Sequence, residues 1–581
     1  MKSNSSPLVV IHFFDWFLEE AWKEDEFVDK FSWEVIGHLE NERESEDFYL
    51  KQFDYIKSLG IDAIAWEYHI QTGKRFDDSG RKFNYPTKNA ITALRKSGLK
   101  IAPFYDHELT YQARTRAQND RRAEISNQNE IKPNDQTIND IDEALSLFYQ
   151  NVPKELHAFD KDGRGVIFIF GYGFDDSDGD PFLWRNFGQI LIEKISQSIK
   201  NPIINWSCKE SYFQQHLFMH HRENFSPFQF VLDTPQSQFG NNCVTWNFGF
   251  DNLGVSLRDK VKRVIKKDEQ YIRQMAWIAL ACNPKMVFIY SWNEPFEDSM
   301  LMPTVRKGQS NARCAKSLIN SLNNNEDRFN LPKTLLIVDD LDEYWISKRG
   351  DWHFEIERQL LFYPLRRYIP QADVKIIGEI SSEILDKYEI IVDISVYKNK
   401  FFCDLIQENI KNGKRILLFD PVSGYTEYDI IGIFGMKGLQ LDINQNISFG
   451  DLSVFARDDI NDLIINNNSI DILSADIKNK KIPIVIKTYN SIFINSYNLN
   501  EEILKIAFEH IYENKINTTI LYGEGIESHR IELDFDDEHP VVYKFNRPGV
   551  MGEFEYKDMH EMRILPKGID EKYHKIIFGL V

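Results

Sequence analysis

The sequence predicts an α/β fold that begins with a TIM-type (β/α)8 barrel. Short apolar runs rich in β-branched and aromatic residues alternate with helical patterns through the first ~300 residues, as is typical of a parallel sheet. Eight such runs precede residue 291, which matches the strand number and length of this barrel. The chain of 581 residues continues well beyond one barrel, so further domains are expected.

The eight barrel strands are expected at the apolar runs. These are residues 8–14, 61–69, 99–105, 165–170, 202–206, 228–232, 243–248 and 286–290, of which the sixth and seventh have the weakest patterns. Helices are expected at 46–59, closed by Gly60, and at 89–96 and 259–281, where apolar residues recur at helical spacing. The segment 110–162 is long and polar, and we expect part of it to form a lid.

Two further parts are expected after the barrel, which we place at residues 1–325. Strand-like runs at 334–338, 374–377, 390–392 and 415–419, separated by helical patterns, predict a flavodoxin- or amidotransferase-like α/β domain over 333–430, completed by 431–515. The run after its last strand contains no Cys that could serve as a glutaminase nucleophile, so we expect a structural role. Residues 516–581 are expected to form a small β-rich terminal region, with strands at 541–545 and 553–556.

Composition and charge exclude several classes of protein. A net charge of −20 disfavours binding to nucleic acid or to an anionic membrane, and no run is long enough to span a membrane. The five Cys are scattered without metal-ligand spacing, so we expect reduced thiols and no metal or cofactor. Without a signal peptide pattern, a cytoplasmic location is expected. Self-association, if it occurs, is expected through the C-terminal domains.

The most informative stretch follows the last predicted barrel strand, Met286–Tyr290. It reads Ser291-Trp292-Asn293-Glu294-Pro295-Phe296-Glu297, and Pro295 should end the strand. Glu294 and Glu297 therefore lie where a buried parallel strand enters a loop, which is the edge where ligands bind in such folds. Paired carboxyl groups beside an aromatic residue suit glycosidic bond cleavage, in which one acts as an acid and the other as a base or nucleophile. The alternative is a pair of ordinary surface acids.

Other polar and aromatic residues at predicted strand ends are candidates for substrate binding. They are Asp15, Trp66, Glu67, Tyr105, His107, Glu108, Tyr172, Trp206, Asp251, Trp292 and Asn293. Trp66, Tyr105 and Trp206 either stack on sugar rings or pack in the core. His107 and Glu108 are adjacent on a strand end and point to opposite sides, which argues against a metal-ligand pair.

The region Tyr271–Thr304 resembles glycoside hydrolase family 99 and its relatives in polysaccharide gene clusters. The shared pattern is a helix, an Asn-Pro turn, an apolar strand, Ser-Trp-Asn-Glu-x-x-Glu and a later Pro-Thr. The chain departs from the family at Pro295 and at Asp298-Ser299, which puts the substrate in question. The resemblance implies a barrel without a metal and endo-acting, retaining cleavage of α-mannoside-type bonds. It also implies that Glu294 is the base acting on the sugar 2-hydroxyl and Glu297 is the acid, although spacing does not show which is which.

Asn-Glu-Pro is also the acid/base signature at the fourth strand of clan A glycosidase barrels. Here Asn293-Glu294-Pro295 follows the last predicted barrel strand, so that arrangement fits less well. Two other functions stay open: a glycosyltransferase or transglycosylase of surface-polysaccharide synthesis, and a non-catalytic glycan-binding scaffold. The missing leader pattern favours the transferase, and the missing glycine-rich donor-site fingerprint disfavours it. Retention of both Glu residues disfavours the scaffold.

Overall fold

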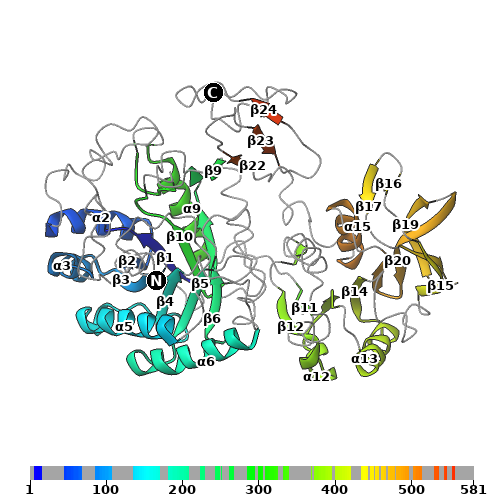
Figure 1. The fold of residues 1–581 in the computed structure, drawn as a ribbon, viewed down its shortest axis with the longest axis horizontal. Coiled ribbons are helices and arrows are strands. Elements are labelled where there is room, and N and C mark those ends of the chain that lie inside the picture. The colour runs from blue at the N-terminus through cyan, green and yellow to red at the C-terminus, as the bar shows by residue number, and fades with distance from the viewer. Residues whose placement is uncertain are drawn as a thin grey trace. The chain divides into compact units, whose positions relative to one another are not determined.

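A computed structural model gives the fold of the chain (Figure 1). It describes residues 6–15, 45–68, 85–107, 135–170, 181–207, 221, 223–228, 243–248, 250–251, 261–266, 284–294, 299–304, 308–324, 332–338, 365, 368–369, 372–395, 399–419, 434–441, 445–449, 452–456, 460–465, 467, 469–477, 479–495, 501–512, 529–534, 542–545 and 553–555. These residues divide between two compact units, 1–237 with 241–328 and 525–581, and 238–240 with 329–524. Each unit is described by itself.

The first unit contains the predicted parallel barrel. Its strands are β1 (Leu8–Phe13), β2 (Ala63–Tyr68), β3 (Lys100–Asp106), β4 (Val166–Phe170), β5 (Ile203–Ser207), β6 (Phe225–Phe228), β7 (Cys243–Asn247) and β10 (Met286–Tyr290). Their order in the sheet is β6-β5-β4-β3-β2-β1-β10-β7, and β6 also contacts β7, so the sheet is nearly closed. All eight lie at or beside the predicted runs, and every pair among them is parallel. The predicted barrel is confirmed.

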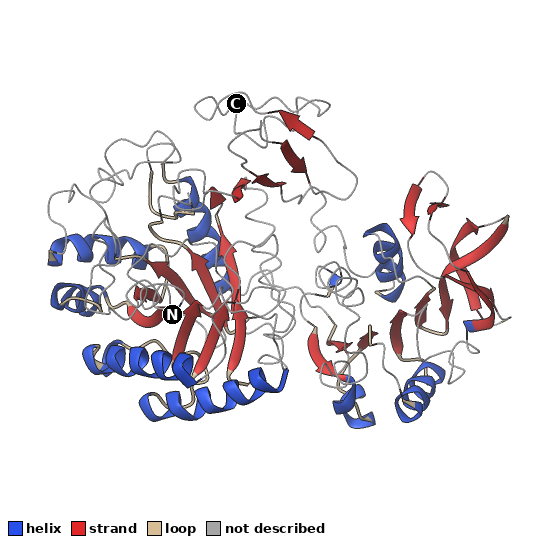
Figure 2. Ribbon diagram, viewed as in Figure 1, coloured by secondary structure: helices blue, strands red, loops and turns tan. Residues whose placement is uncertain are grey.

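Helices cover the outer face of the barrel sheet (Figures 1 and 2). They are α2 (Glu46–Ser58), α3 (Lys88–Ser97), α5 (Asp135–Asn151), α6 (Pro181–Ser198) and α9 (Ser310–Asn324), with a short 3-10 helix, η2 (Lys154–Leu156). A side chain caps the start of each of the first two helices. Ser45 Oγ accepts a hydrogen bond from Phe48 N at the start of α2, and Thr87 Oγ1 accepts one from Ala90 N at the start of α3. Helix α5 falls within the segment expected to supply a lid and packs against β3 and α6 as a crossover helix. Residues 108–134 lie outside the described residues.

One predicted helix is wrong at its start. Residues 259–281 were expected to be helical, whereas Val261–Lys266 form strand β9. This strand pairs antiparallel with β8 (Phe250–Asp251) and with β22 (His529–Asp534), and β23 (Val542–Phe545) and β24 (Glu553–Glu555) complete the sheet. The partner strand is more than 260 residues away in sequence, and helical spacing could not reveal it. Pairing with this distant strand overrides local periodicity here.

The second unit has a mixed seven-stranded sheet in the order β12-β11-β13-β14-β21-β20-β19. The strands are β11 (Thr334–Val338), β12 (Asp373–Ile376), β13 (Ile390–Asp393), β14 (Arg415–Phe419), β19 (Ser469–Ile477), β20 (Lys480–Thr488) and β21 (Ser491–Ile494). The first five strands in this order, from β12 to β21, each pair in parallel with the next. In chain order they run 2-1-3-4-5, the flavodoxin-like arrangement, and this confirms the predicted layered α/β fold.

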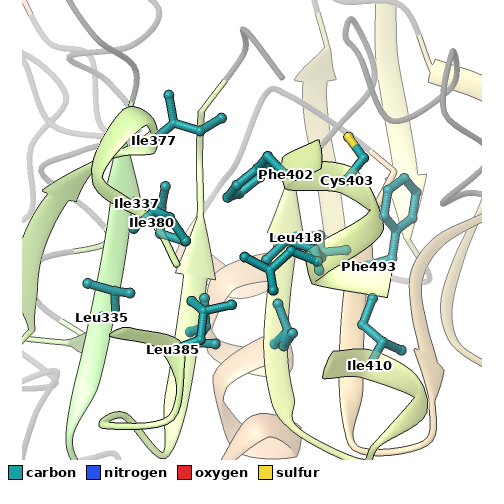
Figure 3. Close-up of a cluster of buried hydrophobic side chains, with 14 of the residues drawn as sticks. Leu335, Ile337, Ile377, Ile380, Leu385, Phe402, Cys403, Ile410, Leu418 and Phe493 are labelled. Carbon is teal, nitrogen blue, oxygen red and sulfur yellow. The ribbon is translucent and has the colours of Figure 1, made fainter. Parts of the chain in front are cut away.

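Apolar side chains from strands and helices form the core of the second unit. Helix α13 (Lys400–Lys411) contributes Phe402 and Cys403, which pack over Leu418 and Phe493 of the sheet (Figure 3). Shorter elements are η3 (Ile377–Glu379), α12 (Ser382–Leu385) and α15 (Glu501–Ile511), and the two-stranded sheets are β15 (Gly435–Leu441) with β18 (Ile460–Ile465) and β16 (Gln445–Phe449) with β17 (Leu452–Ala456).

The predicted domain boundaries stay a prediction. Among the described helices, none is long and apolar enough to cross a membrane.

Gly60, which ends the turn after α2, gives a direct test of the barrel packing. Its φ is +92°, and an added Cβ would lie 2.9 Å from Ile319 Cγ2 of α9. We expect Gly60→Ala to lower the free energy of unfolding by ~2–3 kcal/mol, because backbone strain and a steric clash add. Gly98→Ala is the matched control, since its φ is +72° with no atom within 4 Å of an added Cβ, and it should lose only ~1 kcal/mol. Equal shifts in thermal unfolding would contradict the packing of α9 on this turn.

Candidate active site

The barrel interior changes from apolar to polar along the strands. Alternate strand residues face inward and form one cluster, which includes Val10, Ala63, Ala102, Val166 and Met286 near the amino ends. Toward the carboxyl ends of the strands, the inward-facing positions hold buried polar residues instead. These are His12, Glu67, Asp106, Asn205, Ser207 and Thr245. Burying a polar group lowers the stability of the fold unless the group finds a hydrogen-bond partner. This polar layer lies toward the carboxyl ends of the strands, where barrels of this type hold their active sites.

The chain that leaves β10 is fixed to the end of β1 by a set of hydrogen bonds. Trp292 N donates to the His12 carbonyl at 2.8 Å. Asn293 accepts from Phe14 N through Oδ1 and donates to the Phe14 carbonyl through Nδ2, both at 2.9 Å. The Asn293 side-chain amide thus bonds to both backbone groups of Phe14, just beyond the end of β1, as the backbone of a neighbouring strand would.

The same segment is also paired with the chain that returns after Glu297. Ser291 N donates to the Ser299 carbonyl at 2.7 Å, and Leu301 N donates to the Ser291 carbonyl at 2.8 Å. Glu294 N donates to Ser291 Oγ at 3.1 Å, and Glu294 is only 3% exposed. Glu294 is therefore held in a buried position by its own backbone. Glu297 lies outside the described residues.

Trp292 and Asn293, predicted to contact substrate, bond to other parts of the barrel through their side chains. Trp292 is fully buried, packs on Tyr55, and donates through Nε1 to Gln52 Oε1 of α2 at 3.0 Å. Both polar atoms of the Asn293 side chain are bonded to Phe14. Trp292 therefore cannot serve as the expected sugar platform. The sequence did not reveal that these two side chains bond to α2 and to the end of β1.

The Glu67 carboxyl group lies beside a histidine inside the barrel. Its Oε2 lies 2.8 Å from His12 Nε2, and the two side chains are 6% and 1% exposed. The His12 ring stacks on Phe104 with a centroid separation of 4.0 Å and also packs against Phe14 and Tyr290. Burial lowers the pKa of His12 well below 6.5. A neutral imidazole can then act as the donor to the Glu67 carboxylate.

The three aromatic residues proposed for sugar stacking lie on the outer face of the barrel sheet instead. Trp66 packs on Phe13 and on Tyr49 of α2. Trp206 makes an edge contact with Phe187 of α6, and Tyr105 contacts Tyr68, which stacks on Phe148 of α5. All three are fully buried. The core-packing alternative is therefore correct, because these residues alternate with the inward-facing ones.

The remaining predicted residues are scattered. Asp15 accepts from the Tyr49 hydroxyl at 2.7 Å, and His107 is buried with Nδ1 at 3.3 Å from the Tyr105 hydroxyl. Asp251 belongs to the short strand β8. Glu108 and Tyr172 lie outside the described residues. Of the predicted set, the structure places Glu67 on β2 and Glu294 just beyond β10, at the polar end of the barrel, and these two strands flank β1.

Sequence reasoning missed His12, Asn205 and Tyr290. Each occupies an inward-facing position of a strand, and Asn205 Nδ2 reaches the Ile167 carbonyl at 3.0 Å within the barrel wall. The sequence pattern that could have indicated them is a polar residue that shares the inward-facing side of a strand with apolar residues two positions away. Among the described side chains, no three His, Cys, Asp or Glu residues converge as a metal site would require. The expected absence of a metal stays a prediction.

Comparisons with known proteins give the fold but no family. No family model matches the sequence, and no curated protein matches it. The structure is similar to a β-galactosidase from Bacillus circulans sp. alkalophilus, with a TM-score of 0.50, 10% identity and coverage of 97% of each chain. At this identity the similarity shows the fold alone, which is a TIM barrel followed by further domains.

Two other solved structures are similar at lower scores. An α-L-fucosidase, isoenzyme 2 from Paenibacillus thiaminolyticus, has a TM-score of 0.48 at 9% identity and covers 95% of this chain and 91% of its own. The GH99 endo-α-mannosidase from Bacteroides thetaiotaomicron has a TM-score of 0.35 at 10% identity, covering 55% of this chain and 98% of its own. Similarity at these scores does not show a family, so the family 99 resemblance stays a prediction.

Replacing Asn293 tests the link between β10 and β1. Asn293→Ala leaves the buried Phe14 N–H and carbonyl without their side-chain partner, and we expect a loss of ~2–4 kcal/mol in the free energy of unfolding. Asn311→Ala is the matched control, because Asn311 donates one half-buried bond to the Met300 carbonyl and should lose ~1 kcal/mol. Chemical denaturation of both variants measures the difference. A smaller loss for Asn293→Ala than for the control would rule out this role.

The burial of His12 predicts a pH dependence of stability. Because the folded-state pKa lies below 6.5, the unfolded chain takes up a proton that folded His12 does not as the pH falls through that value. Wild type should therefore lose stability on acidification below pH ~6.5, by up to ~1.4 kcal/mol for each pH unit until the folded pKa is reached. His12→Gln lacks this group and should show a shallower decline. Parallel thermal-unfolding curves between pH 7.5 and 5 would contradict the neutral, buried state of His12.

Proposed function

We propose that this protein is a glycoside hydrolase that cleaves glycosidic bonds in a polysaccharide or glycan, with Glu294 and Glu297 as its working carboxyl groups. The observation that carries the proposal is the buried, backbone-fixed position of Glu294 beyond the end of β10. This end of an eight-stranded parallel barrel is where such enzymes hold their sites. The β-galactosidase that shares the fold is itself a glycosidase by name, which agrees with the class of reaction but says nothing of the sugar.

The position of the motif in the barrel supports a mechanism other than that of clan A. Asn293-Glu294-Pro295 follows β10, the eighth barrel strand in chain order. The residues directly after β4 and β7, Gly171–Asp180 and Phe248–Asn252, include aspartates but no glutamate. Both proposed carboxyl groups therefore come from one loop. Its two ends are joined by the bonds between Ser291 and Ser299, which supports Glu297 as the partner of Glu294.

We take the family 99 resemblance as the finer form of the proposal, an endo-acting and retaining cleavage of α-mannoside-type bonds. Glu294 removes the proton of the sugar 2-hydroxyl, whose oxygen attacks the anomeric carbon, while Glu297 gives its proton to the leaving oxygen. Glu297 then takes a proton from water as the water oxygen opens the anhydro ring, and Glu294 returns its proton to the 2-oxygen. Two inversions at one carbon retain its configuration.

The test is hydrolysis of a panel of α- and β-linked aryl glycosides and fluorescently labelled oligosaccharides. Wild type should release sugar from at least one member, and Glu294→Gln and Glu297→Gln should each reduce kcat/KM by 10²–10⁴-fold, the usual loss when a general acid or base is removed. Glu155→Gln is the control, because Glu155 is exposed and paired only with exposed Arg95 among the described residues, and it should behave as wild type. Nucleotide-sugar consumption without sugar release would contradict hydrolysis and favour the transferase.

A further inference from the structure

Besides Glu294, the described part of the barrel holds a second buried glutamate at the carboxyl ends of its strands, Glu67. Glu67 is 5% exposed and occupies an inward-facing position of β2, and β2 pairs with β1 on the side opposite to β10. Glu67 therefore lies on one neighbour of β1, and Glu294 lies just beyond the end of the other. The sequence named Glu67 only as one of several candidates for substrate binding, and the chemistry of a two-carboxyl cleavage does not use it.

His12 contacts the Glu67 carboxyl group. Its Nε2 is 2.8 Å from Glu67 Oε2. The two atoms do not meet hydrogen-bond geometry in this structure, and hydrogen bonds of catalytic sites are often poorly aligned until substrate binds. Aromatic rings on several sides fix the imidazole plane. The His12 carbonyl accepts from Trp292 N. One residue thus contacts Glu67 through its side chain and the Glu294 segment through its backbone.

We propose that Glu67 binds a hydroxyl group of a neutral sugar at the deep end of the site and that His12 is the positioning residue that orients it. This inference rests on the proposed function and adds a substrate class to it. A carboxylate is an acceptor only, so a sugar hydroxyl can donate to it. An anionic sugar would meet Glu67, Asp106 and Glu294, and no Lys or Arg occupies a described inward-facing position in the carboxyl half of the strands. Like charges in this buried region repel strongly.

Kinetics with the best glycoside of the panel tests the role of His12. Glu67→Gln should reduce kcat/KM by ~10–100-fold, since a bond to a charged group is lost, and His12→Leu should give a similar loss because Glu67 is no longer oriented. His12→Gln keeps a donor amide and should retain activity within ~10-fold. In the Glu67→Gln background, His12→Leu should change little further, because residues that act through one another are not additive.

A matched control separates orientation from stability. His157 is also a buried histidine, but its Nε2 lies at 2.9 Å from the Val152 carbonyl on the helix-facing side of the barrel. His157→Gln should lower the melting temperature and leave kcat/KM unchanged. Additive losses for His12→Leu and Glu67→Gln, or no rescue by His12→Gln in a folded protein, would overturn the positioning role.

Binding without turnover separates this inference from the proposed function. Calorimetry with methyl mannoside, galactoside, glucoside and fucoside, and with mannuronate, galacturonate and glucuronate, measures which sugars bind the full chain. We expect at least one neutral glycoside to bind at millimolar concentration, its uronate at least 10-fold more weakly, and Glu67→Gln to weaken the neutral sugar by ~10–100-fold. Equal or tighter uronate binding, unchanged binding by Glu67→Gln, or no binding of any neutral glycoside would each overturn it. Sugar binding with no hydrolysis in the panel would overturn the hydrolase alone.

Discussion

The arrangement of the candidate site depends on how the eighth barrel strand is fastened to the first. Strand β1 lies between β2 and β10, and beyond the last ladder bond its backbone is held by Trp292 N and by the Asn293 side chain. Backbone groups buried at a strand end must find partners. The sequence supplies them from the residues directly before Glu294, so the requirement for hydrogen bonding at β1 also fixes the position of the carboxyl group. Packing of Trp292 on α2 and its bond to Gln52 extend this constraint into the helix layer.

A second constraint is the filling of the barrel. Apolar side chains close the interior near the amino ends of the strands, and aromatic rings surround His12 further along. A low-dielectric environment keeps the imidazole neutral and strengthens its interaction with the Glu67 carboxylate. Rigid packing and a polar layer thus occur together, which is how a site keeps charged groups in place without exposing them to water.

Much of the fold could be predicted from the sequence. Parallel strands buried on both faces have a distinctive composition, and the eight barrel runs and the four runs from Thr334 to Phe419 were all identifiable. The strand at Val261–Lys266 was missed because its partner at His529–Asp534 is remote in sequence. The direction of each side chain was the harder problem. A strand end that contains Trp66-Glu67 presents one residue to the helices and the next to the interior, and the sequence offered both residues as candidates for ligand binding. Strand register, which sequence does not give, places Glu67 toward the interior and Trp66 toward the helices.

The most direct test of the central claim, that the carboxyl end of this barrel cleaves glycosidic bonds by means of Glu294, is isotope incorporation from water. Wild type and Glu294→Gln would be incubated with a set of neutral polysaccharides in H₂¹⁸O, and the new reducing ends analysed by mass spectrometry. We predict that wild type produces oligosaccharides carrying one ¹⁸O at each new reducing end and that Glu294→Gln produces almost none. Equal labelling by both proteins, or chain rearrangement by wild type without ¹⁸O, would contradict hydrolysis at this site.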